Sequence, residues 1–265
     1  KGRLAGLDSA FIAAARLGFA LLVFLPFLRL RGLTTRTVLA LNAIGAVQFG
    51  LMYLAYNESF RHLRAHEVAL FTITTPILVT LFADALERTL RLRALLAALL
   101  AVTATVPVAL KSTDVRLTLV GIALVQLSNA AFAAGQVLYK HLCARQPGLR
   151  AREVFGLLYG GAFGITLAAF VSRASPAPVV VTPAQLWTLA YLGVLASGLG
   201  FFLWNVGATR VGAGTLAVMN NAKIPLAVAC SLIFFGERAD LPWLGASLAL
   251  MGAAVWVAEG RARDP

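Results

Sequence analysis

Residues 9–30, with the sequence SAFIAAARLGFALLVFLPFLRL, decide the class of this protein, because they stay apolar over a length that can cross a lipid bilayer. A helix needs about 20 mostly apolar residues to cross about 30 Å of hydrocarbon. Hydrophobic residues make up 60% of the 265-residue chain, and its mean hydropathy is +0.83. We therefore expect an all-α, polytopic helical membrane protein. Eight further apolar blocks follow the first, at roughly 37–60, 65–86, 92–110, 117–139, 151–172, 183–207, 213–235 and 241–258.

The composition also excludes several kinds of function. Short turns join the blocks, so no soluble domain with its own core is expected, and function must lie between helices. The net charge of +12 comes mostly from basic residues in the turns, where they orient helices, so nucleic acid is not an expected partner. The two cysteines, Cys143 and Cys230, suggest neither a disulfide framework nor a metal site.

Enzymatic chemistry finds little support in the sequence. The three histidines, His62, His66 and His141, lie in or next to turns, and none belongs to an HExxH pattern. The sequence shows no nucleophile motif, paired-carboxylate arrangement or phosphate-binding loop. We therefore expect no catalytic residue, no cofactor and no metal.

An internal repeat relates the two parts of the chain, 1–110 and 111–265. Identical residues that recur at one constant, long spacing indicate that a segment of the chain was duplicated. The matching pairs are Arg61 with Arg210 and Pro76 with Pro225, each 149 residues apart, and Glu87-Arg88 with Glu237-Arg238, 150 apart after an inserted Gly236.

The repeat predicts ten helices in an inverted arrangement. The second part holds five apolar blocks and the first only four, so we expect a further helix before residue 1; the alternative is a true nine-helix protein. Two five-helix units must run in opposite directions through the membrane, as in many secondary transporters. Positive charge in the turns favours cytoplasmic termini in a bacterial inner membrane.

Polar residues inside the blocks share single helix faces and predict a central cavity. Such side chains are costly at bilayer depth and usually face the bundle interior. The alternative is that they only join helix to helix. The residues aligned in this way are Gln126, Asn129, Gln136 and Lys140; Asn42, Phe49, Tyr53 and Tyr56; Glu67, Phe71 and Thr74; and Asn220 with Lys223.

Lys223 is the most informative of these residues, because it lies in the middle of an apolar block beside two asparagines. It can hold a carboxylate or phosphate of a substrate, or form a structural ion pair with Glu67 or Asp84. Arg16 is also inside a block, but it lies nearer the end and can extend to the interface.

Pro76 and Pro225 stand at equivalent positions of the repeat. Each removes a helix hydrogen bond and frees a carbonyl four residues earlier. We expect them to act as hinges for alternating access; a static kink is the alternative.

Three segments together resemble a known family. They are AAARLGFALLVF (13–24), TITTPILVTLFADALERT (72–89) and NNAKIPLAVACSLIFFGERAD (220–240), and their pattern is similar to that of the drug/metabolite transporter superfamily, EamA type. The resemblance covers the whole chain and implies ten helices that carry small metabolites. Within the family, the aromatic face and the NNAKIP segment look most similar to YddG-like exporters of aromatic amino acids. Asp84 to Arg88 departs from the usual Gly-Glu-Arg.

The resemblance and the polar faces together predict a monomeric exporter of aromatic and other apolar amino acids that works by alternating access. Other cargoes on the same fold (nucleosides, sugars, phosphorylated compounds or drugs) remain alternatives, as does a sensor or scaffold. Passive flux and proton coupling through Glu67 or Asp84 both stay open. The expected substrate site comprises Tyr53, Tyr56, Phe49, Trp204 and Phe71 against the side chain, and Lys223, Asn220, Gln126, Asn129 and Thr74 against the polar groups.

Overall fold

The computed structural model describes residues 4, 6–63, 65–110, 118–173, 179–222, 226 and 241–259, and these residues form helices and turns without any strand. The all-α, multi-pass membrane fold that the sequence predicts is confirmed. Six helical segments within these ranges are long and apolar enough to cross a membrane: Ser9–Phe27, Thr35–Ser59, Glu67–Glu87, Leu119–Arg145, Ala151–Arg173 and Pro183–Ala208.

The three other apolar blocks are helical wherever they are described. They comprise α6 (Leu92–Leu110), residues 213–222 and α12 (Leu241–Glu259). Lys223, Pro225 and the second Glu-Arg pair lie outside the described residues, so the roles predicted for them stay predictions.

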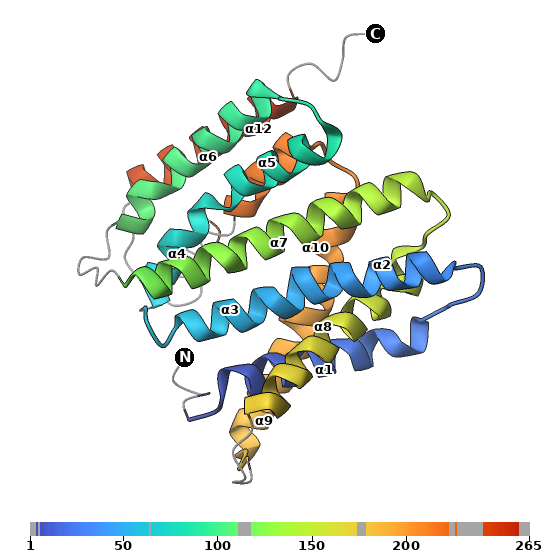
Figure 1. The fold of residues 1–265 in the computed structure, drawn as a ribbon. Helices are drawn as coiled ribbons and strands as arrows, with labels where there is room; N and C mark the ends of the chain where they lie inside the picture. The colour runs from blue at the N-terminus through green and yellow to red at the C-terminus, as the bar shows by residue number, and fades with distance from the viewer. Residues whose placement is uncertain are drawn as a thin grey trace. The chain divides into compact units, whose positions relative to one another are not determined.

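The helices pack in two compact units, and each unit takes helices from both parts of the chain. The first comprises Lys1–His62 and Leu119–Arg210, and the second comprises Leu63–Thr118 and Val211–Pro265. In the first unit, α8 (Ala151–Arg173) packs along α1 (Ser9–Phe24), and α7 (Leu119–Arg145) packs along α3 (Met52–Ser59) (Figure 1).

Glycines let the helices of the first unit touch through their backbones. A Cβ atom on Gly45 would lie 1.9 Å from the carbonyl oxygen of Leu158, and one on Gly135 would lie 2.2 Å from Cβ of Gln48. Small residues at helix contacts are the usual means of close packing in membranes, where apolar lipid gives helices no hydrophobic reason to associate. Gly45 ends α2 (Thr35–Gly45), so α2 is fixed against α8 at this point.

Two spans of the first unit contain π-helical turns, at positions that the predicted repeat makes equivalent. One lies at η3 (Ala46–Leu51) between α2 and α3. The other lies at η5 (Leu192–Gly200) between α9 (Pro183–Tyr191) and α10 (Phe201–Ala208). The repeat spacing of 149 carries residues 46–51 onto 195–200, which fall inside η5. Wide turns of this kind are rare and often mark functional sites.

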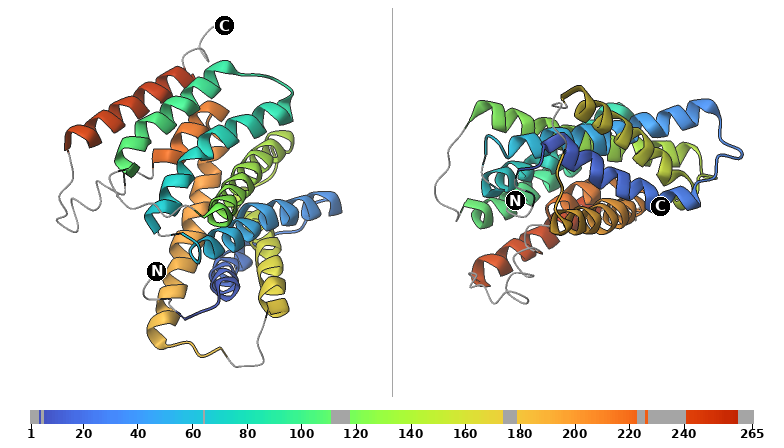
Figure 2. Two further views of the ribbon diagram at one scale, coloured as in Figure 1. Left: turned by 60° about the vertical axis from the view of Figure 1, so that its left-hand side comes forward. Right: turned by 90° about the horizontal axis from the view of Figure 1, so that it is seen from below.

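In the second unit, α6 and α12 lie side by side, as the left view of Figure 2 shows, and small apolar residues pack between them. A further span of this unit runs through α4 (Ala65–Phe71), η4 (Thr72–Thr74) and α5 (Thr75–Glu87). The buried residues between α6, α12 and the helix over 213–222 are Ala97, Ala101, Val218, Met251 and Ala254.

The span that contains Pro76 is interrupted by the short 3-10 turn η4, after which the α-helix restarts at Thr75. The Thr75 hydroxyl donates to the Thr72 carbonyl at 2.6 Å. The Asn221 amide donates to the Ile73 carbonyl at 2.9 Å. The interruption is therefore supported by side-chain hydrogen bonds, and the hinge role of Pro76 stays a prediction.

Asp84, one of two carboxylates considered for proton coupling, holds the turn after α5. Its Oδ2 atom accepts from the Arg91 backbone amide at 2.9 Å, and its Oδ1 atom lies 3.9 Å from Nε of Arg91. The turn passes through Arg88 in a left-handed conformation with φ of 52°. These contacts show a structural role for Asp84 at the end of its span.

Candidate functional site

Three spans of the first unit bring one cation and two hydroxyls together. The Arg16 guanidinium, on α1, donates from Nη2 to the Tyr53 hydroxyl at 2.6 Å and from Nε to the Ser197 hydroxyl at 3.2 Å. The hydroxyls of Tyr53 and Ser197 lie 2.9 Å apart. The three side chains thus form a closed triangle, which we call the Arg16 site.

The Arg16 guanidinium is a membrane-embedded cation with no acidic partner among the described residues. Its carbon Cζ lies 4.4 Å from the centre of the Tyr53 ring, so the ring face supplies a cation–π contact. Intramembrane cations normally pair with anions or line a substrate pathway. The planar guanidinium has five N–H donors, and its side-chain bonds to Tyr53 and Ser197 leave several for a carboxylate.

The wide turn η5 positions Ser197 in this site. A Cβ atom on Gly193 would lie 2.9 Å from the Arg16 carbonyl oxygen, so η5 lies directly against α1. Within η5, the buried Tyr159 hydroxyl is bonded to the Ser197 carbonyl and to the Gly198 carbonyl, the latter at 2.8 Å. The π-helical backbone is thereby held in place by a side chain from α8.

Aromatic rings fill the space beside the Arg16 site. Phe49 stacks on Phe201 with ring centres 5.1 Å apart and on Tyr159 with centres 5.4 Å apart. Phe201 also contacts the Tyr53 ring at 6.0 Å. The Phe49 side chain is fully buried, so in this conformation it packs in the core of the first unit.

Buried amides run along the same pair of spans. Gln48 in η3 donates to the Asn205 side-chain carbonyl at 3.0 Å, and both residues are fully buried. Trp204 donates from its indole nitrogen to Oε1 of Gln136, on α7, at 3.0 Å. Trp204 therefore has a polar partner within the predicted cavity face of α7.

The other predicted site residues fall in both units. Tyr56 lies on α3, where its ring meets Phe60 edge-on at 5.0 Å, and the Asn129 amide lies 3.5 Å from Oε1 of Gln126 on α7. In the second unit, the Thr74 hydroxyl donates to the Phe71 carbonyl at 3.0 Å and the Asn220 amide to the Leu216 carbonyl at 2.8 Å. These contacts are local, and they neither establish nor exclude a substrate role.

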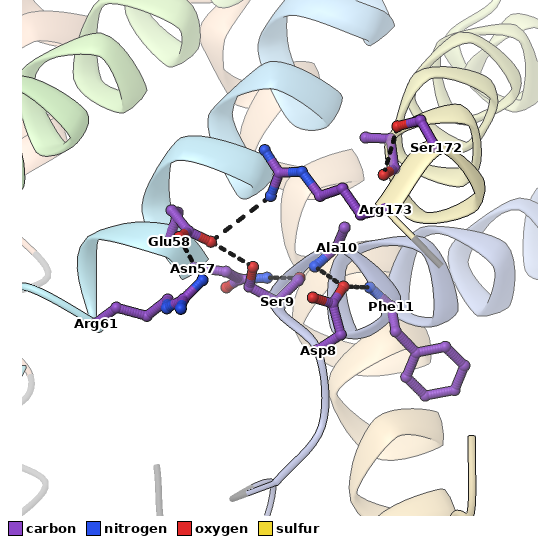
Figure 3. Close-up of polar contacts among 10 residues, drawn as sticks. Asp8, Ser9, Ala10, Phe11, Asn57, Glu58, Arg61, Ser172 and Arg173 are labelled. Atoms are coloured by element: carbon purple, nitrogen blue, oxygen red, sulfur yellow. Dashed lines mark hydrogen bonds and ion pairs between the residues drawn. The ribbon is translucent and has the colours of Figure 1, made fainter. Parts of the chain in front are cut away.

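A second polar cluster joins three helices at one end of the first unit (Figure 3). Glu58, near the end of α3, accepts from the Ser9 hydroxyl at 2.7 Å and from Arg61 at 3.0 Å. Arg173, at the end of α8, lies 3.7 Å from the same carboxylate. We call this group the Glu58 cluster. Its contacts hold the ends of α1, α3 and α8 together.

Arg16, Ser197, Gln48 and Asn205 did not enter the predicted substrate site. A signal for Arg16 was present in the sequence, because it is a charge inside an apolar block, but its place near the block's end favoured an interfacial role. Ser197 gives no signal by itself. The predicted repeat spacing of 149 pairs it with Gln48, and only the structure shows that both lie in wide turns.

Comparisons with known proteins are consistent across the chain. The sequence model of the EamA-like transporter family matches residues 1–110 and 119–258. The "Probable biotin transporter" of Pseudomonas aeruginosa is 42% identical, with 96% of this chain and 89% of that protein covered. The "Biotin transporter" of Salmonella typhimurium is 38% identical over 99% of this chain and 92% of its own length.

The "Biotin transporter" of Escherichia coli K12 is also 38% identical, over 96% of this chain and 85% of its own length. One solved crystal structure superposes with a TM-score of 0.73 at 18% identity, covering 99% of this chain and 91% of that one. At that identity the likeness concerns the fold alone.

Proposed function

The chain belongs to the EamA-like transporter family, and from this premise we propose that it carries biotin, or a closely related monocarboxylate, across a bacterial inner membrane. The family that the sequence resembles is thereby confirmed. The finer resemblance to exporters of aromatic amino acids is not supported, because the relatives described above are named as biotin transporters. The proposed substrate therefore belongs to the alternative given by the sequence, in which the same fold transports another small metabolite.

The observation that carries this proposal is the Arg16 cation without an acidic partner among the described residues. Biotin has a single ionisable group, a carboxylate at the end of a short alkyl chain, and its ring system is neutral. A guanidinium held by two hydroxyls is a suitable partner for such a carboxylate. Phe201, which contacts Tyr53, provides apolar surface beside that site.

An amino acid fits the same site less well. Its ammonium group lies next to its carboxylate and would be held close to the Arg16 cation. Like charges at short range repel strongly where water is excluded. No described carboxylate stands at the Arg16 site to offset that repulsion.

The direct test is uptake of labelled biotin into proteoliposomes that contain the full-length protein. We expect saturable uptake that desthiobiotin inhibits and phenylalanine does not. Replacing Arg16 with Met should weaken biotin binding by about 10- to 100-fold, because charge-assisted hydrogen bonds are lost. Arg36→Met, at an exposed arginine on α2, is the matched control and should leave uptake unchanged.

Two results would count against the proposal. One is saturable phenylalanine flux without biotin flux. The other is biotin flux that the Arg16 substitution leaves unchanged. Lys223 remains the alternative anion site proposed from the sequence, and Lys223→Ala measured in parallel decides which of the two cations binds the carboxylate.

A further inference from the structure

Gln48 ends a chain of amide hydrogen bonds whose direction is fixed by the backbone. The Phe201 carbonyl can only accept, and it accepts from Nδ2 of Asn205 at 2.9 Å. The Asn205 side-chain oxygen must therefore point to its other partner, which is Nε2 of Gln48 at 3.0 Å. Because an amide has one donor end and one acceptor end, the remaining Gln48 atom, Oε1, is an acceptor.

That oxygen is buried and, among the described residues, makes no hydrogen bond. A buried acceptor without a donor destabilises the folded protein by about the full free energy of removing that group from water. Such atoms are rare in native proteins, and each calls for an explanation. Flipping the Gln48 amide cannot repair it, because the flipped oxygen would face the Asn205 oxygen.

The oxygen lies close to the Arg16 site along the same two spans. Gln48 precedes Tyr53 by five residues, which is about 6–8 Å along a helix axis. Asn205 follows Ser197 by eight residues on the opposite span. The two spans thus carry, at one level, the two hydroxyls that bind the Arg16 guanidinium of α1 and, roughly one to two turns away, the Gln48 acceptor.

We infer that Gln48 Oε1 accepts a hydrogen bond from an N–H group of the transported molecule, so that the first unit recognises its cargo at two points. The inference rests on the proposed function. Biotin matches the pair, since a short alkyl chain separates its carboxylate from a cyclic urea that carries two N–H groups. Gln48 then determines specificity for a carboxylate with a distal N–H donor over one without it.

Access to this oxygen requires another state of the transport cycle. In the present conformation α7 lies against the Gln48 side chain, with Gly135 as the point of contact. Ligand entry therefore involves movement of α7 away from η3. The acceptor stays unsatisfied while the site is empty, which favours the ligand-bound state.

The test compares biotin with lipoic acid, which has a similar alkyl carboxylate and no N–H group. We would measure the Kd of both for the full-length protein in nanodiscs. Gln48→Leu should weaken biotin binding by about tenfold and leave lipoic acid binding unchanged. Thr166→Val is the matched control, because among the described residues the buried Thr166 hydroxyl bonds only carbonyls of its own helix, and it should change neither Kd.

A second variant keeps the test informative if Gln48→Leu folds poorly. In Gln48→Glu, a protonated carboxyl can still donate to Asn205 and present a carbonyl oxygen as acceptor. Preference for biotin over lipoic acid should therefore persist at about pH 5.5 and increase towards pH 8 as the carboxyl ionises, because a carboxylate accepts a hydrogen bond from an N–H group more strongly than a neutral carbonyl does. The wild-type preference should be flat over that range.

The outcomes separate the two proposals. Equal loss of both ligands in Gln48→Leu, or no loss of either, overturns the inference while biotin transport stands. A wild-type protein that does not bind biotin overturns the proposed function and this inference with it. A selective loss of biotin binding supports both.

Discussion

Tyr53 is the residue whose hydroxyl joins the Arg16 guanidinium to Ser197. We predict that Tyr53→Phe weakens biotin binding by about 3- to 10-fold, because the guanidinium loses the bond that holds its orientation. Binding assays on purified protein measure this directly. Tyr191→Phe, at an exposed tyrosine on α9, should behave as wild type. Equal affinities for Tyr53→Phe and wild type would contradict the positioning role.

The sequence identified part of this site and missed the rest for physical reasons. Tyr53 was identifiable because it shares a helix face with other polar and aromatic residues. Ser197 was not, because serine in an apolar span usually bonds its own helix and carries no further signal. Arg16 was visible, but its depth in the membrane and its partners depend on how three spans pack, which a single sequence does not show.

At the scale of the helix, Gly45 tests the close contact between α2 and α8. We predict that Gly45→Ala destabilises the protein by about 1–3 kcal/mol, because its methyl group would overlap the Leu158 backbone. The change appears as a lower melting temperature in detergent. Gly164→Ala is the control, since a Cβ atom there meets nothing within 4 Å, and its melting temperature should match wild type.

The Glu58 cluster gives a prediction for the helix ends that it joins. Glu58→Gln should let the first turn of α1 open more often, because the Ser9 hydroxyl loses its charged acceptor and that acceptor loses the ion pairs with Arg61 and Arg173. Such pairs contribute at most about 1 kcal/mol, so amide hydrogen exchange over residues 9–12 should speed up by about fivefold or less. Arg150→Gln, which removes an ion pair at the start of α8, should leave that segment unchanged. Unaltered exchange in Glu58→Gln would show that the cluster contributes nothing to holding α1.

The prediction of helices succeeded because block length and apolarity determine membrane spans almost independently of packing. Irregularities inside the spans could not be foreseen in the same way. The interruption of the helix before Pro76 could be foreseen, because proline removes a backbone hydrogen bond of the helix. The wide turns η3 and η5 contain no proline, and they are stabilised by contacts such as the Tyr159 hydroxyl on η5, which comes from another part of the chain.

At the scale of the whole molecule, the charge distribution predicts a C-terminus in the cytoplasm. The arginines after the last helix, Arg261 and Arg263, favour that side under the positive-inside rule. A green fluorescent protein fused after residue 265 should fluoresce in a bacterial host, and an alkaline phosphatase fused there should be inactive. An active phosphatase fusion together with a non-fluorescent fusion would show that the C-terminus lies on the opposite side of the membrane.

The paired π-helical turns bear on the history of the gene. A π-helical turn holds one more residue than an α-helical turn, and it can arise when a helix gains a residue by insertion. Such an insertion after duplication would have left a wide turn in only one of the two spans, whereas η3 and η5 overlap when the repeat spacing of 149 is applied. If the two parts arose by the duplication that the sequence predicts, an insertion before that duplication accounts for both wide turns, and the half-length ancestor carried this irregular helix.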